Sequence, residues 1–253
     1  MAERQTALIT GASSGIGADL ARLFARDGYN LVLVARREAK LRELGVAATV
    51  IAADLTDPAA PRRIAGELRA KSIDVDVLVN NAGVGLTGAF AETDLRKELE
   101  MIQVNIVALT ELTKLLLPGM VARRRGRILN VASTAAFQPG PLMAVYYATK
   151  AYVLSFSEAI AEELRETGVT VTALCPGPTE TGFADAANAG ATRLFTMTRP
   201  ATSADVARAG YEAMQRGRRV VIPGAKNKLL AQSVRVSPRR LVTTIVRKMQ
   251  ENA

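Results

Sequence analysis

Two polar residues, Tyr146 and Lys150, stand four positions apart in a stretch of helical character, so their side chains share one face of a helix. A phenol has a pKa near about 10 and is a poor acid-base catalyst at neutral pH. A cation held close favours the phenolate and lowers that pKa by about 1–3 units. The pair could therefore exchange a proton with an alcohol or a developing alkoxide. Tyrosine and lysine one turn apart are also common on ordinary helices, so this spacing alone does not establish a site.

A serine hydroxyl precedes this pair in the chain. Ser133 directly follows the apolar stretch that ends at Ala132. At the carboxyl end of a strand its hydroxyl could hydrogen-bond a carbonyl oxygen, although a lone serine would equally suit a turn. The chain has no histidine, which excludes Ser-His-Asp and Cys-His catalysis and imidazole metal sites. Its single cysteine, Cys175, ends an apolar run, and we interpret it as a buried apolar residue rather than a reactive thiol. We predict no metal site.

A glycine-rich segment from Thr10 to Gly17 follows an apolar run and opens an amphipathic stretch. Glycines permit a tight turn, and a helix N-terminus offers free N–H groups and a positive dipole end to a pyrophosphate. The spacing is Gly-x3-Gly-x-Gly rather than the usual Gly-x-Gly-x-x-Gly, and such turns also occur for packing. We interpret the segment as a nucleotide-binding turn whose contact residues are Gly11, Ser13, Ser14, Gly15, Ile16 and Gly17.

The residues at the end of the second predicted strand indicate whether NAD(H) or NADP(H) is the preferred cofactor. A carboxylate at this place would hold the ribose 2′-hydroxyl of NAD, but the chain has Ala35, Arg36 and Arg37. A guanidinium matches a 2′-phosphate bidentately. The alternative is that one or both arginines merely begin a solvated helix. We predict NADP(H) as the cofactor, with Arg36 as the main contact and Ser13 or Arg37 assisting.

Short apolar runs alternate with longer amphipathic stretches along the chain, which predicts a doubly wound α/β fold with a mostly parallel, seven-stranded Rossmann-type sheet and helices on both faces. The predicted strands are Thr6–Thr10, Asn30–Ala35, Thr49–Ala53, Val75–Asn80, Arg127–Val131, Val169–Leu174 and Arg219–Ile222. The predicted helices are Ile16–Asp27, Glu38–Leu44, Ala59–Lys71, Leu95–Arg123, Tyr146–Glu166 and Ala204–Arg216. Ligands of such sheets bind beyond the carboxyl ends of the strands, where the strand order reverses.

Several of these features together resemble one family. Thr10–Gly17, Asn80–Gly83, Ser133, Tyr146-x3-Lys150 and Pro176-Gly177 occur in the order and at the spacings of the short-chain dehydrogenase/reductase family, over about residues 4 to 225. The resemblance implies that Tyr146 is the acid/base, that Ser133 positions the substrate oxygen, and that Lys150 lowers the phenol pKa and binds the nicotinamide ribose. It also implies that Asn105 supports a water-mediated proton relay. The family often has glycine three positions after that asparagine, where this chain has Ala108.

The same resemblance extends the cofactor site. It places Asp54 and Leu55 at the adenine, and Asn81, Ala82 and Gly83 on the ribose side. Thr181 matches the threonine that touches the nicotinamide amide. The remaining cofactor contacts that it implies are Pro176, Gly177 and Thr179, the last at a position where many relatives carry Val or Ile.

These features predict an NADP(H)-dependent oxidoreductase that moves hydride between a nicotinamide and a carbonyl or alcohol. Three loops, 84–91, 134–145 and 180–202, carry apolar side chains that either line a hydrophobic pocket or seal the loops onto the core. We expect a hydrophobic ketone or a 3-oxoacyl compound as the small-molecule substrate. Two alternatives remain open, a non-enzymatic NADP(H)-binding regulator and a lyase or epimerase on the same fold. The apolar loop residues are Leu86, Phe90, Phe137, Leu142, Met143, Phe183, Leu194, Phe195 and Met197.

The chain has 253 residues and a net charge of +9, but its charge excess is local. Residues 213–250 hold ten basic residues and no acid, which leaves 23 basic and 24 acidic residues elsewhere. We therefore divide the chain into one Rossmann-type catalytic domain, residues 1–225, and a basic C-terminal extension, residues 226–253. Near the end, apolar residues recur at helical spacing beside bases. Such a helix could bind an anionic membrane surface, dock an acyl carrier, pack on a second subunit, or form an inert solvated tail.

Expectations about other partners and about the cellular location rest on features that the sequence lacks and on the family resemblance. The segment has no aromatic residue for base stacking, so no nucleic acid is expected as a partner. The resemblance implies a homodimer or homotetramer formed through the helices at 95–123 and 146–166. The first residues lack the features of a signal peptide, and no uninterrupted apolar run reaches the length of a membrane span. We expect a cytoplasmic protein.

Overall fold

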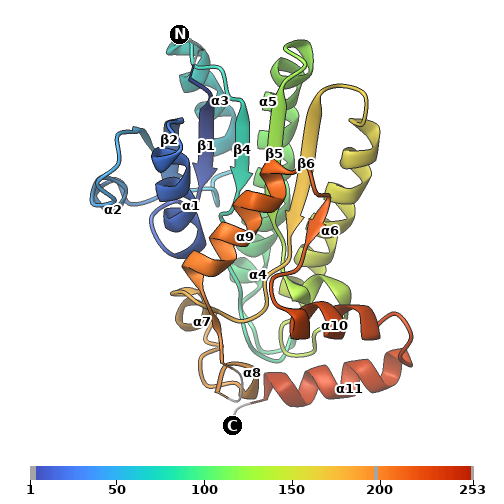
Figure 1. Ribbon diagram of the computed structural model, residues 1–253. Coiled ribbons are helices and arrows are strands. Elements are labelled where there is room, and N and C mark those ends of the chain that lie inside the picture. Colours follow the sequence, from blue (N-terminus) through green and yellow to red (C-terminus); the bar gives the residue numbers. More distant parts are fainter. Residues whose placement is uncertain (1–3, 197–198, 252–253) are drawn as a thin grey trace.

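The computed structural model describes residues 4–196 and 199–251, and within them a seven-stranded parallel sheet forms the centre of the molecule (Figure 1). The strand order is β3-β2-β1-β4-β5-β6-β9. Chain connections run outward from β1 to β2 and β3, then return to β4 on the other side of β1. The strand order therefore reverses between β1 and β4, where a ligand crevice is expected. The predicted doubly wound fold is confirmed. The strands are β1 (Thr6–Thr10), β2 (Asn30–Ala35), β3 (Thr49–Ala52), β4 (Val77–Asn80), β5 (Gly126–Val131), β6 (Val169–Leu174) and β9 (Val220–Val221).

Helices cover both faces of this sheet because the strands are apolar on both sides. On one face, α1 (Gly15–Arg26) packs on β1 and β2, and α9 (Ser203–Gln215) packs on β5 and β6, with Phe24 and Met214 fully buried. On the other, α3 (Ala60–Ala70), α5 (Leu109–Ala122) and α6 (Ala144–Glu163) bury residues such as Ile64 and Leu112. The short helix α2 (Glu38–Arg42) follows β2. This packing holds the carboxyl ends of the strands in one rigid rim.

The predicted helix over 95–123 differs from a regular α-helix. It consists of α4 (Leu95–Ile102), a π-helical turn at Gln103–Ala108 and then α5. Asn105 lies inside the π-helical turn, a feature that often marks functional positions. Leu95–Ala122 is also long and apolar enough to cross a membrane by length and composition, but Leu112 and Met120 are buried in the core of the fold. Apolar periodicity cannot reveal the extra residue of a π turn.

Several short elements near the rim were not predicted. The strands β7 (Thr179–Glu180) and β8 (Ala201–Thr202) form a separate parallel pair, and α7 (Phe183–Ala186) and α8 (Arg193–Thr196) lie between them. A 3-10 turn covers Thr134–Phe137. Elements of two to four residues carry too few positions for a periodic pattern.

The C-terminal segment forms two helices below the carboxyl ends of the strands (Figure 1). They are α10 (Ala225–Ser233) and α11 (Arg239–Gln250). The helical spacing of apolar residues near the end of the chain is confirmed by α11, which lies beside α8. The division of the chain at residue 225 stays a prediction, while these contacts place α11 against the catalytic rim.

Candidate active site at the carboxyl ends of the strands

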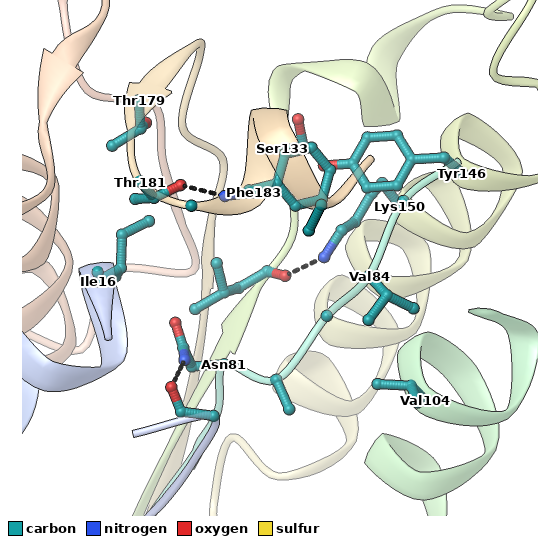
Figure 2. A pocket seen from close by; sticks show the side chains of 18 of the residues that line it. Ile16, Asn81, Val84, Val104, Ser133, Tyr146, Lys150, Thr179, Thr181 and Phe183 are labelled. Carbon is teal, nitrogen blue, oxygen red and sulfur yellow. Dashed lines mark hydrogen bonds between the residues drawn. The ribbon is translucent and has the colours of Figure 1, made fainter. Parts of the chain in front are cut away.

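A cavity of about 630 Å³ opens at the rim and brings most of the predicted site residues together. Ser133 follows β5 and begins the 3-10 turn, where its hydroxyl accepts from the backbone N–H of Ala135 at 3.1 Å. Tyr146 and Lys150 lie in the first two turns of α6. Figure 2 shows Ser133 and the phenol of Tyr146 pointing toward one another, with Lys150 beside them. The three side chains thus meet in one space although they come from two separate elements.

Lys150 is held by the end of β5. Its Nζ donates to the carbonyl oxygen of Val131 at 2.9 Å and lies 5.8 Å from the ring centroid of Tyr146. The residue is 5% exposed. Because burial disfavours the charged form, the pKa of Lys150 falls from 10.5 to about 8. Lys150 is therefore a buried amine whose charge is sensitive to pH in the mildly alkaline range.

The pKa of the Tyr146 phenol is raised, whereas the sequence led us to expect that Lys150 lowers it. Burial raises the pKa of Tyr146, and the hydrogen bond with Ser133 only partly offsets this effect. The Lys150 ammonium donates to Val131 and is not among the groups that shift the phenol. Tyr146 is thus fully protonated at neutral pH, the form that can donate a proton to a substrate oxygen.

Replacing Lys150 with methionine should raise the free energy of unfolding at neutral pH. The folded lysine, with its pKa of about 8 against 10.5, binds fewer protons than the unfolded one between these values, so wild-type stability rises with pH across that window. The gain from Lys150→Met should be largest below pH 8, at about 3 kcal/mol, and shrink toward pH 10.5. Urea denaturation of both proteins near pH 7 and near pH 10 measures this difference. A gain that is the same at both pH values would contradict the buried charge.

The glycine-rich turn between β1 and α1 forms the far wall of the cavity. Gly11 and Gly15 have φ of +63° and +54°, a region that side-chain-bearing residues rarely adopt. A Cβ at Gly17 would lie 2.4 Å from Nδ2 of Asn81, and that amide donates to the carbonyls of Thr10 and Gly11 at 2.9 and 3.1 Å. The turn therefore needs glycine, and Asn81 fastens it to the end of β4. Five of the six predicted contact residues of this segment line the cavity, and Gly17 does not.

The two arginines after β2 lie at the same end. Arg36 and Arg37 are exposed and line the cavity together with Asp54 and Leu55. In the described part of the chain, neither guanidinium has an ion-pair or hydrogen-bond partner. Asp54 instead accepts from the backbone N–H of Thr56 at 3.0 Å. Two free guanidinium groups beside a phosphate-binding turn can hold a further phosphate.

This donor set fits a dinucleotide. One continuous cavity runs from the glycine turn and α1 N-terminus, through Asn81, Ala82 and Gly83, to Ser133 and Tyr146. The glycines let the turn pack closely against Asn81, Ala82 and Thr181. No side chain caps the N-terminus of α1, so its backbone N–H groups can bind a phosphate. In the described residues, no group of three or more His, Cys, Asp or Glu is arranged to hold a metal ion.

Asn105 does not line this cavity. It is 1% exposed, and its amide exchanges two 3.0 Å hydrogen bonds with the backbone of Val84 and donates to Thr149 at 3.0 Å. It therefore joins the loop after β4 to α6. A Cβ added at Gly83 would come 3.3 Å from Nζ of Lys150 and 3.4 Å from the Asn105 side chain. The observed contacts of Asn105 position the segment that carries Lys150.

The segment after β6 closes the cavity. Pro176, Gly177, Thr179 and Thr181 all line it. The Thr179 hydroxyl donates to the carbonyl of Gly177 at 2.9 Å, and Thr181 accepts from the N–H of Phe183 at 3.2 Å. Cys175, just before this segment, is fully buried, and burial raises its pKa to about 12. The interpretation of Cys175 as an inert apolar residue is confirmed.

Of the nine apolar residues named for the predicted substrate loops, three line the cavity, namely Met143, Phe183 and Leu194. The ring of Phe183 packs on Tyr146 with their centroids 5.2 Å apart. Phe90 is instead 66% exposed, and Met197 and the side chain of Phe195 lie outside the described residues. The substrate end of the cavity is therefore partly apolar.

Sequence reasoning missed two residues of this site. Tyr147 and Gln250 both line the cavity, and Nε2 of Gln250 donates to the Tyr147 hydroxyl at 2.6 Å. No local pattern links two residues 103 positions apart, and only the packing of α11 reveals the contact.

The chain is similar to known proteins in sequence and in fold. The family model described as short chain dehydrogenase matches residues 5–192. A very-long-chain 3-oxoacyl-CoA reductase from Phaeosphaeria nodorum is 37% identical over 65% of this chain, which spans only 52% of that protein. The ketoacyl reductase HetN from a Nostoc species is 32% identical over 79% of this chain and 73% of its own length. The solved structure of a short-chain dehydrogenase from Sphingobium yanoikuyae in complex with NADPH has a TM-score of 0.82 and 33% identity, covering 94% of this chain and 95% of that one.

Proposed function

The chain belongs to the short-chain dehydrogenase/reductase family, and from this premise we propose that it is an NADP(H)-dependent reductase of a hydrophobic ketone or a 3-oxoacyl compound. The observation that carries the proposal is that Ser133, Tyr146 and Lys150 line the same cavity as the glycine turn. A protein that only bound the nucleotide would have no need of a buried phenol aligned with a serine hydroxyl.

The reaction follows from the protonation states of these groups. A bound NADPH would supply the hydride for the carbonyl carbon. As negative charge develops on the carbonyl oxygen, Tyr146 donates its phenol proton and Ser133 donates a hydrogen bond. The raised pKa of Tyr146 keeps that proton available at neutral pH. Lys150 binds the nicotinamide ribose, and its charge stabilises the phenolate that proton transfer leaves behind. Asn105 keeps the loop at Val84 and α6 in place.

Preference for NADP(H) is supported by the two unpaired guanidinium groups of Arg36 and Arg37 beside the turn. The residue before them, Ala35, offers no carboxylate to a ribose 2′-hydroxyl. The similar protein from Sphingobium yanoikuyae is described in complex with NADPH. A hydrophobic ketone or 3-oxoacyl substrate is supported by Met143, Phe183 and Leu194 at the cavity wall, and by the names of the two similar reductases.

An NADPH-oxidation assay with a panel of ketones, aldehydes and 3-oxoacyl thioesters tests this function. Consumption of NADPH with formation of an alcohol is the expected result. A regulator would bind NADPH without turnover of any member of the panel. A lyase or epimerase would convert its substrate with no net change in NADPH.

We propose a homodimer or homotetramer as the assembly. The proposal is supported by exposed apolar side chains on the long helix that consists of α4, the π-helical turn and α5. No described part of the chain covers these side chains. They are Leu95, Leu99, Val107 and Leu115.

For the C-terminal segment we propose reversible binding of an otherwise cytoplasmic protein to anionic membranes. Five of its large apolar residues are exposed, namely Leu229, Leu230, Val236, Leu241 and Ile245. Of the ten bases in residues 213–250, only Arg216, Arg219 and Arg247 have an ion-pair partner among the described residues. An amphipathic surface that joins exposed apolar residues to unpaired bases suits a membrane interface.

Full-length protein should therefore co-sediment with liposomes that contain anionic lipid at low salt, and much less at high salt. Each basic residue near the surface contributes about 1 kcal/mol, so the pair of changes Arg240→Glu and Lys248→Glu should weaken binding by at least tenfold. Lys40→Glu on α2 is the matched control and should bind as the wild type does. Point changes are preferable to truncation because α11 contacts Tyr147. No binding to anionic liposomes at low salt, or equal effects of the control, would contradict the proposal.

A further inference from the structure

The helix α11 delivers one polar side chain to the catalytic cavity. Gln250, the last residue of α11, is 2% exposed and lines the cavity together with Ser133 and Tyr146. Its Nε2 donates to the Tyr147 hydroxyl at 2.6 Å. Tyr147 is adjacent in sequence to the proposed acid, and the two rings pack edge to face with centroids 6.1 Å apart. The end of the chain is thus part of the substrate side of the site.

Packing on every side fixes the position of Gln250. Val246, one turn earlier on α11, packs against a buried apolar cluster that includes Met143, Tyr147 and Ala187. The backbone N–H of Arg193 donates to the carbonyl of Glu251 at 3.0 Å, which fastens the end of α11 to α8 (Figure 1). A Cβ at Gly140 would lie 2.2 Å from the ring of Tyr147, so that ring is held closely as well. These contacts hold the end of α11 and the ring of Tyr147 beside the cavity.

The carboxamide oxygen of Gln250 has no hydrogen-bond partner. Six buried side-chain atoms share this property within the described residues, and among their residues only Gln250 lines the catalytic cavity. A buried polar atom without a partner is rare and costly in folded proteins. An amide oxygen accepts hydrogen bonds and cannot donate them, so what completes this site must be a donor.

We infer that the Gln250 oxygen accepts a hydrogen bond from an O–H or N–H group of the substrate, at a position separate from the reacting carbonyl. The inference rests on the proposed reductase function, because Tyr146 defines where the carbonyl lies. It narrows the substrate class to carbonyl compounds that carry a second, hydrogen-bond-donating group such as a hydroxyl or an amide N–H on an otherwise apolar body. Tyr147 is the positioning residue that holds Gln250 through its hydroxyl.

The test compares ketones that differ only in a distal group. A series of 2-alkanones from pentanone to nonanone is prepared with a terminal methyl, methoxy or hydroxyl group. The hydroxyl donates and accepts, the methoxy group only accepts, and the methyl group does neither. At the chain length that reaches Gln250, the wild type should prefer hydroxyl over methoxy by about tenfold in kcat/KM.

Variants at position 250 separate an effect on substrate recognition from an effect on protein stability. Gln250→Met has a similar volume but no strong acceptor, and its hydroxyl-to-methoxy ratio should fall to about one. Gln250→Glu keeps an acceptor oxygen and should retain a preference for the hydroxyl compound. Thr244→Ala, an exposed change on the same helix, is the matched control and should keep the wild-type ratio. Because each ratio compares two substrates of one enzyme, a general loss of stability cancels.

Three results would overturn the inference. They are equal use of hydroxyl and methoxy compounds by the wild type at every chain length, a preference for methoxy, and an unchanged ratio in Gln250→Met. Titration of the protein–NADPH complex with the same ketones, followed by NADPH fluorescence, gives the ratio as dissociation constants without turnover. Absence of turnover for the whole series would contradict the reductase function, whereas the binding ratio would still decide the role of Gln250.

Discussion

Replacing Tyr146 with phenylalanine should reduce kcat by about a thousandfold while NADPH still binds. The phenol proton acts as the carbonyl oxygen gains charge, and general acid catalysis is worth about 10²–10⁴-fold. The change removes one oxygen and keeps the ring that packs on Phe183, so the loss should appear in kcat rather than in cofactor affinity. Steady-state kinetics and an NADPH titration of the same preparation measure both quantities.

Tyr147→Phe is the matched control for this experiment. Its hydroxyl accepts from Gln250 rather than facing Ser133, so its removal should cause a much smaller loss of kcat. If Tyr147→Phe abolished turnover and Tyr146→Phe did not, the assignment of the proton donor would be wrong by one residue.

Replacing Arg36 with aspartate should reverse the cofactor preference. We expect the wild type to bind NADPH at least about tenfold more tightly than NADH, since a charged hydrogen bond contributes about 1.5–3 kcal/mol. Arg36→Asp removes that contact and adds a carboxylate that repels the 2′-phosphate and accepts from a 2′-hydroxyl. Two effects of about 2 kcal/mol each change the ratio of dissociation constants by about a thousandfold.

The controls for Arg36→Asp introduce aspartate at neighbouring basic residues. Arg37→Asp should shift the ratio less, and Lys40→Asp, whose side chain pairs with Glu43, should leave it nearly unaltered. Equal shifts in all three variants would indicate a general charge effect. Tighter binding of NADH by the wild type would contradict the role of Arg36.

The sheet was predictable from the sequence because its inner strands β2, β1, β4, β5 and β6 are buried on both faces and read as largely apolar runs. Each predicted strand is present, with ends that differ by at most two residues; Val75–Asn80, for example, is shortened to β4 at Val77–Asn80. The helices on the two faces were equally clear from their amphipathic spacing. The pairing of β7 with β8 was not, since each has two residues and their partners are 22 positions apart.

The candidate site was predictable where residues follow strands, as Gly11, Asn81 and Ser133 do. Parallel strands end at one rim, so such residues must meet. The roles of these residues in catalysis and cofactor binding stay predictions. The direction of the Tyr146 pKa could not be read from its spacing with Lys150, because it depends on where Nζ points, and Nζ points at Val131. Gln250 could not be found because tertiary packing alone brings α11 to the cavity.

The central claim is hydride transfer to a carbonyl carbon, and isotopic labelling tests it most directly. NADPH carrying deuterium on C4 of the reduced nicotinamide, in each stereochemical form separately, is incubated with the protein and the ketone that it turns over. For one of the two forms, mass spectrometry should find one deuterium on the carbinol carbon of the product, and Tyr146→Phe should form this labelled product about a thousandfold more slowly than the wild type. Product that carries no deuterium from either form, or that accumulates without oxidation of NADPH, would contradict the assignment as a reductase.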